Sequence, residues 1–166
     1  MSIDRLREVE EFLQMLREQR RSLEKEILLT TGLQQTQAEQ RLRKDIKPKL
    51  REYETEYWQI LASESETVAI PEPEIEVVIA EIVEQTAQLQ TSPEYSDKVK
   101  VLEWLQRIHA EVSKPGTPAA AKLKGTLSLM PPFVNLSYEA ELDTENFLRT
   151  NFPTFTKLYE KVAKKS

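Results

Sequence analysis

The sequence predicts a mainly α-helical protein, in which a long antiparallel helical hairpin (1–62) is followed by a linker (63–73) and a small, mostly helical domain (74–166). Apolar residues recur every three or four positions over long stretches, as on the buried face of a helix. Between them lie mostly Arg, Glu, Gln and Lys, which are strong helix formers. Because 39% of the 166 residues are hydrophobic and 31% charged, the composition suits a helix-rich globular chain rather than a disordered one.

The first arm of the hairpin carries a stripe whose spacing alternates between three and four residues, which keeps one face toward a partner helix. Arg20 is a charged member of this stripe. The stripe is made wider than a coiled-coil seam by Ile3, Phe12, Leu28 and Leu29. A wide stripe is typical of a helical bundle. The stripe consists of Ser2, Leu6, Val9, Leu13, Leu16, Arg20, Leu23 and Ile27.

A turn at 30–32 connects the two arms, because Gly32 adopts a positive φ without the steric penalty of a Cβ atom. In the second arm, Pro48 predicts a kink or a new helix start, since proline lacks the backbone donor and restricts the residue before it. The apolar stripe of this arm consists of Leu42, Ile46, Leu50, Tyr53, Tyr57, Ile60 and Leu61.

The domain after the linker opens with two predicted helices. One begins at Pro73 and presents Ile75, Ile79 and Ile82, although the β-branched residues at 75–79 also suit a strand. The other repeats apolar residues from Val99 to Val112 and ends at the proline- and glycine-containing segment 114–118.

The segment 126–142 predicts a β-hairpin, because apolar and polar residues alternate strictly on both sides of a turn at Pro131 and Pro132. A helix is the alternative interpretation, since Val134, Tyr138 and Leu142 lie four residues apart. Two further helices are expected after this segment, one capped by Asp143 or Thr144 and one restarted at 153.

Charge is distributed unevenly along the chain, although the net charge is only −5. Residues 1–62 carry 12 basic and 12 acidic side chains, whereas residues 63–98 carry 1 and 9. The acidic middle repels phosphate groups, and the flanking parts do not interleave basic with aromatic residues, so nucleic acid is disfavoured as a partner.

The absence of cysteine excludes disulfides and thiolate metal sites and is compatible with a reducing compartment. No apolar run approaches the length of a membrane span, and the charged N-terminal stretch lacks the apolar core of a signal peptide. We therefore expect a cytoplasmic protein.

No residue pattern predicts catalysis, a cofactor or a metal. His109 is the single histidine, and no nucleophile or acid that would partner it in general base catalysis is identifiable. The alternating Glu72, Glu74 and Glu76 lack the spacing of a calcium loop. The three glycines are too far apart to build a phosphate-binding loop. The sequence therefore predicts that the protein is not an enzyme.

The hairpin, with its Leu and Glu/Arg pattern and its closing YETEYW at 53–58, resembles helical accessory modules of bacterial signalling and defence proteins. Such modules accompany NTPase, caspase-like or TIR domains, none of which is present in this chain. The resemblance covers about 60 residues. It implies an adaptor or effector-associated role and carries over no functional residue.

These observations together favour a non-enzymatic protein–protein interaction or adaptor module that acts through its helical hairpin, by self-association or on a protein partner. The alternative is a membrane-acting effector that uses the apolar segment 126–142, although we expect that segment to be buried against the core. The candidate interaction residues are Leu13, Leu16, Leu50, Tyr53, Tyr57, Met130 and Phe133.

Overall fold

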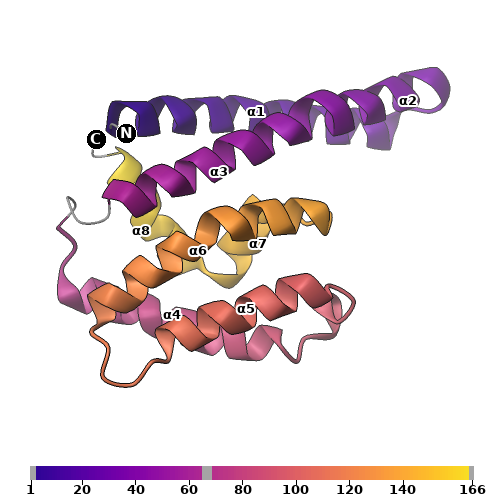
Figure 1. Cartoon of the computed structure of the whole chain (residues 1–166). Helices are drawn as coiled ribbons and strands as arrows, with labels where there is room; N and C mark the ends of the chain where they lie inside the picture. The colour runs from indigo at the N-terminus through magenta and orange to yellow at the C-terminus, as the bar shows by residue number, and fades with distance from the viewer. Residues whose placement is uncertain (1–2, 65–68, 165–166) are drawn as a thin grey trace.

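The computed structural model describes residues 3–64 and 69–164, and the regular elements in these two ranges are all helices. This confirms the mainly α fold. The long hairpin lies on one side of the molecule, and helices of the C-terminal part pack beneath it (Figure 1). The linker predicted at 63–73 includes 65–68, which lie outside the described residues.

The first arm of the hairpin is α1 (Ile3–Leu29), and the second arm is formed by α2 (Gly32–Arg41), the π-helical turn η1 (Leu42–Ile46) and α3 (Lys47–Glu64). Gly32 has φ +66° at the turn, as predicted. The apolar members of the α1 stripe from Leu6 to Leu23 are buried. Arg20, the charged member, is directed toward Asp143 at 3.4 Å and therefore joins the hairpin to the rest of the chain.

A π-helical turn precedes Pro48, where the sequence predicted a kink or a new helix start. The backbone N–H of Lys47 donates to the carbonyl of Leu42, five residues earlier. A wider turn of this kind accommodates a proline, which has no N–H and whose ring crowds the carbonyl four residues earlier in an α-helix. The second arm therefore continues through Pro48 with a local change of helix type.

The C-terminal part contains α4 (Glu72–Leu89), a 3₁₀ turn η2 (Pro93–Tyr95), α5 (Val99–Val112), α6 (Ala119–Glu139), α7 (Thr144–Asn151) and α8 (Pro153–Lys164). The strand interpretation of 75–79 is wrong, because these residues lie within α4. α6 is central: Figure 1 shows it between the hairpin arm α3 and the pair α4 and α5.

The β-hairpin predicted at 126–142 is wrong, because α6 is a continuous helix as far as Glu139. The alternating pattern indicated a strand only because hydroxyl side chains were counted as solvent-facing positions. Thr126 and Ser137 are in fact buried, and their hydroxyls donate to carbonyls of the preceding turn, those of Lys122 at 3.0 Å and Val134 at 2.9 Å.

Pro131 and Pro132 lie inside α6, where an interior proline normally costs about 3 kcal/mol. Burial outweighs this cost. Leu127, Met130 and Phe133 are each at most 2% exposed, and a fully buried side chain of this size contributes about 1.5–3 kcal/mol. In addition, the indole N–H of Trp104 donates to the carbonyl of Leu129 at 3.0 Å, next to the prolines.

One hydrophobic core includes buried residues from both arms of the hairpin and from the C-terminal part. For example, the ring of Trp58 on α3 stacks on that of Phe155 on α8, with centroids 5.3 Å apart and planes 5° apart. The hairpin is therefore packed against the helices that follow it. The apolar stripe of α1 is covered by the chain itself from Leu6 to Leu23.

Candidate functional site

The hairpin ends in an apolar tip, defined here as residues 27–38, that projects beyond the body of the protein (Figure 1). Leu28, Leu29 and Leu33 are 83%, 70% and 73% exposed. No residue between 27 and 38 is charged. Large apolar side chains exposed together on a projecting element are typical of an interaction surface.

Side-chain hydrogen bonds hold the tip in a defined conformation. The hydroxyl of Thr30 donates to the carbonyl of Glu26 at 2.6 Å, and the side-chain amide of Gln35 donates to the carbonyl of Ile27 at 2.9 Å. These bonds satisfy carbonyls at the end of α1 that have no partner within the helix. Because Ala38 is buried and Ile27 packs against the core, the turn is anchored from below while its leucines face solvent.

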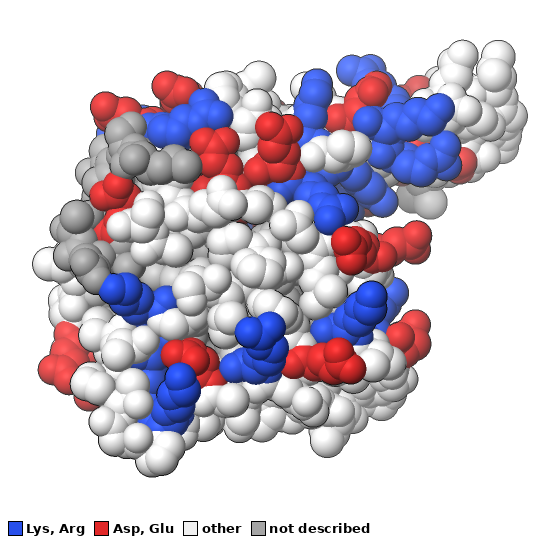
Figure 2. Space-filling model, in the orientation of Figure 1, with Lys and Arg blue, Asp and Glu red and all other residues white. Residues whose placement is uncertain are grey.

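Basic side chains lie behind the tip. Figure 2 shows them gathered on the hairpin next to the uncharged end. Residues 20–51 carry nine basic and four acidic side chains, whereas the rest of the chain carries 14 and 24. The tip end of the hairpin is thus positive on a protein that is negative as a whole. We call the exposed residues Lys25, Arg41, Arg43, Lys44 and Lys49 the basic belt.

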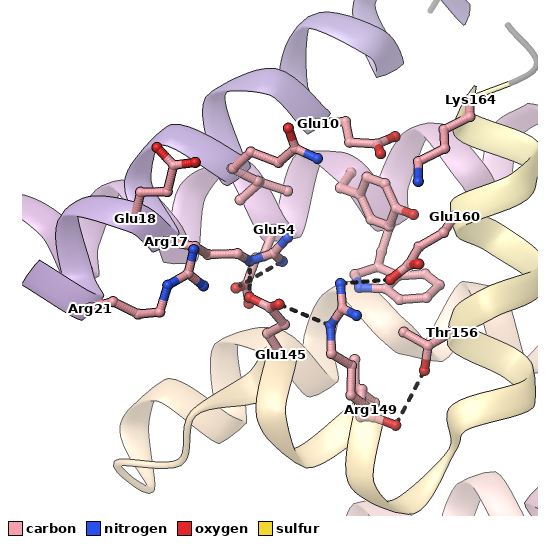
Figure 3. Close-up of a pocket in the computed structure, with 15 residues that line it drawn as sticks. Glu10, Arg17, Glu18, Arg21, Glu54, Glu145, Arg149, Thr156, Glu160 and Lys164 are labelled. Carbon is pink, nitrogen blue, oxygen red and sulfur yellow. Dashed lines mark hydrogen bonds and ion pairs between the residues drawn. The ribbon is translucent and has the colours of Figure 1, made fainter.

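A second feature is a charged cleft of about 350 Å³ between α1, α3, α7 and α8 (Figure 3). Trp58 and Leu13 contribute its apolar wall. Charged side chains of both signs line it, from elements that are distant in the sequence. These are Glu10, Arg17, Glu18, Arg21, Glu54, Glu145, Arg149, Glu160 and Lys164.

Five of these nine charged side chains form ion pairs with one another. Arg17 on α1 forms ion pairs with Glu54 at 3.5 Å and with Glu145. Arg149 on α7 contacts Glu145 at 2.9 Å and Glu160 at 2.7 Å. This chain of ion pairs connects the hairpin to α7 and α8, so its first effect is to hold these helices together.

Glu54 is the most buried charged residue of the cleft, at 3% exposure. Burial raises the pKa of its carboxyl group to about 7, and the nearby guanidinium of Arg17 opposes this rise. Burial also raises the pKa of Tyr138, with a further contribution from the charge of Glu54. A hydrogen bond between the side chains of Glu54 and Tyr138 lowers the pKa of Glu54 and raises that of Tyr138.

His109 lies outside this cleft. Its Nδ1 is 2.8 Å from the hydroxyl of Thr86, which joins α5 to α4. Across 3–64 and 69–164, no group of three or more His, Asp or Glu side chains is arranged to hold a metal ion. The cleft therefore offers charge and hydrogen-bonding groups but brings no histidine to its carboxylates.

The structure places the predicted interaction residues inside the molecule. The three leucines among them, Leu13, Leu16 and Leu50, are buried. Met130 and Phe133 are also buried, within the central helix α6. Tyr53 and Tyr57 are partly buried and pack against the core. In this conformation the set therefore forms internal contacts.

The exposure of the tip leucines was not predicted from the sequence. Sequence reasoning used Leu28 and Leu29 only to widen the buried stripe. One signal was available, because these leucines adjoin the Thr-Thr-Gly turn in a run without charge. A residue next to a hairpin turn has fewer neighbours in the partner arm and is more exposed.

In the described ranges, no helix has both the length and the apolar character needed to cross a membrane. Comparisons with protein-family models, curated proteins and solved structures found no match to this chain.

Proposed function

We propose that this chain is a non-enzymatic interaction or adaptor module that binds a protein partner through the tip of its helical hairpin. The exposure of Leu28, Leu29 and Leu33 on a projecting, uncharged turn carries this proposal. Burying such side chains against a partner is favourable because it removes apolar surface from water.

The rigid support of the tip adds to this argument. Because side-chain hydrogen bonds fix the turn, little conformational entropy is lost when a partner binds it. The basic belt supplies charge that steers an acidic partner toward the tip. The belt contains no aromatic side chain on which a base stacks, so a nucleic acid is the less suitable partner.

A membrane-acting role for the segment 126–142 has less support. Leu127, Met130 and Phe133 are core residues, and their release requires separation of α6 from both the hairpin and α5. A catalytic role also has less support, since the carboxylates at the centre of the charged cleft are engaged by Arg17 and Arg149. An adaptor in the cytoplasm agrees with the resemblance of the hairpin to effector-associated modules.

The test uses the absence of cysteine from the chain, which allows a single cysteine to be labelled cleanly. Leu33→Cys carries a benzophenone photocrosslinker at the tip. Lys157→Cys carries the same group on the exposed surface of α8 as the matched control. Both proteins are irradiated alone and in extract of the source cells, and the adducts are identified by mass spectrometry.

We expect a defined protein adduct, with either another protein or a second copy of the chain, from position 33 and not from position 157. The proposal is refuted if position 33 gives no adduct beyond those obtained at position 157.

A further inference from the structure

We propose that the partner of the tip is a second copy of this chain, which receives the leucines on the exposed face of α4. This inference rests on the proposed function and specifies its partner. It follows from the complementary character of two surfaces on opposite parts of the molecule, the tip with its basic belt and the acidic face of α4.

The exposed face of α4 combines apolar and acidic residues. Val77 is 58% exposed, and the small residues Ala80 and Ala87 lie on the same side of the helix. This side follows steps of four, three, four and three residues, which define one helical face. Its members are Pro73, Val77, Ala80, Glu84 and Ala87, all exposed.

The acidic character of α4 is not balanced within the helix. It contains five glutamates and no basic residue. Glu81 is used within the molecule, because its carboxylate accepts hydrogen bonds from the backbone N–H groups of Thr154 and Phe155, each at 3.0 Å. The exposed glutamates at 72, 74, 76 and 84 flank the apolar centre at Val77.

The tip has the opposite arrangement of charge around a similar apolar centre. Its leucines are followed along the second arm by Arg41, Arg43 and Lys44 of the basic belt. Placing Leu33 on Val77 and Ala80 of another copy brings these cations toward the carboxylates of α4. Opposite charges around an apolar contact favour the encounter and select the orientation.

The two surfaces are too far apart to meet within one molecule. Figure 1 shows the tip and α4 at different ends of the structure, with α6 and the rest of the hairpin between them. A contact between different patches on two copies is heterologous, and such contacts form rings or open chains. A hairpin turn on a helix face is a small interface, so the assembly is expected to be weak and concentration dependent.

An anionic lipid surface is the competing partner for an apolar tip with a basic belt. The second copy fits better because it supplies both an apolar strip and carboxylates.

The experiment is sedimentation velocity on the full chain over a wide concentration range. Leu33→Asp removes the apolar tip, and Val77→Arg places a cation on the α4 face. Val99→Arg is the matched control, since Val99 is 59% exposed but lies at the start of α5. All three substitutions are at exposed positions, and circular dichroism verifies that each variant is folded.

We expect the sedimentation coefficient of the wild-type chain and of Val99→Arg to rise with concentration, and to rise less in high salt. Leu33→Asp and Val77→Arg each remain monomeric. A mixture of these two variants forms a heterodimer and no larger species. The intact tip of Val77→Arg binds the intact α4 face of Leu33→Asp, and no second pair of intact surfaces remains.

The inference is overturned if the wild-type chain stays monomeric, or if Val77→Arg assembles as the wild type does. It is also overturned if the tip binds vesicles of phosphatidylserine and phosphatidylcholine in preference to a second copy. In these cases an adduct from position 33 with a different protein leaves the proposed function standing. The absence of any specific adduct from that position refutes both.

Discussion

Glu54 is expected to make the folded protein less stable as the pH rises from about 4.5 to about 7. Burial raises the pKa of this carboxyl group to about 7, against 4.5 as its ordinary value. The folded protein therefore holds the proton more tightly than the unfolded chain. The stabilising effect is complete below about pH 4.5 and is lost as the pH rises through the folded pKa.

The magnitude follows from the difference between the two pKa values. One pKa unit corresponds to about 1.4 kcal/mol, so Glu54 contributes a pH-dependent change of roughly 3 kcal/mol to the free energy of unfolding. Solvent screening does not reduce this figure much, because the side chain is only 3% exposed. The nearby Arg17 is already included, since its charge lowers the pKa that burial raises.

The assay is urea unfolding of the wild-type chain and of Glu54→Gln at a series of pH values from 4.5 to 8. Glutamine matches glutamate in size but does not titrate, so the variant is the control for every other ionisable group. We expect the wild type to lose roughly 3 kcal/mol relative to the variant over this range. Parallel stability profiles would show that Glu54 is not buried as a protonated acid.

Three further substitutions test the packing and the turns, each by the free energy of unfolding in urea. Phe133→Ala in α6 is expected to cost about 3–5 kcal/mol, because this side chain is buried. Ser128→Ala on the exposed side of the same helix should change stability by less than about 0.5 kcal/mol. Equal effects would contradict the central position of α6. Gly32→Ala is expected to cost about 1–2 kcal/mol, because a residue with a Cβ is strained at φ +66°. Nothing lies within 4 Å of the added Cβ, so no clash adds to this cost. An unchanged stability would argue against the turn conformation. Asp143→Ala should cost about 1 kcal/mol more than Asp143→Asn, because both lose the ion pair with Arg20 while asparagine retains most of the α7 N-cap bond. Equal losses would exclude the cap.

The elements that sequence analysis predicted best are those whose packing is local and periodic. The buried face of α1 agrees with the predicted spacing from Leu6 to Leu23. In α5 the agreement holds from Leu105 to Val112, whereas Val99 at the start of the predicted stripe is exposed. Pro48 marked the place of a local irregularity, the π-helical turn before it, although the arm continues through this residue.

α6 was not predictable on the same basis, because its environment is supplied by helices that come before it in the chain. Packing on two sides buries hydroxyl residues as well as apolar ones, and this removes the polar positions that mark the solvent side of a helix. The two prolines then suggested a turn, whereas tertiary contacts keep the helix continuous.

The two candidate sites were hidden for different reasons. The charged cleft joins Arg17, Glu54, Glu145 and Glu160, which have no common sequence spacing and meet only in the folded chain. The position of the tip leucines beside the turn is visible in the sequence. However, an apolar stripe in the sequence does not show at which residue the partner helix stops covering the stripe. The structure supplies that limit through the exposure of Leu28, Leu29 and Leu33.

Photocrosslinking from a single cysteine tests the claim that the tip is the contact surface most directly. With the label at position 33, the account predicts a specific protein adduct, which in the purified protein maps to residues 72–89 of a second copy. With the label at position 157, no such adduct is expected. Equal adduct yields from the two positions, or no specific adduct from position 33, would contradict the account.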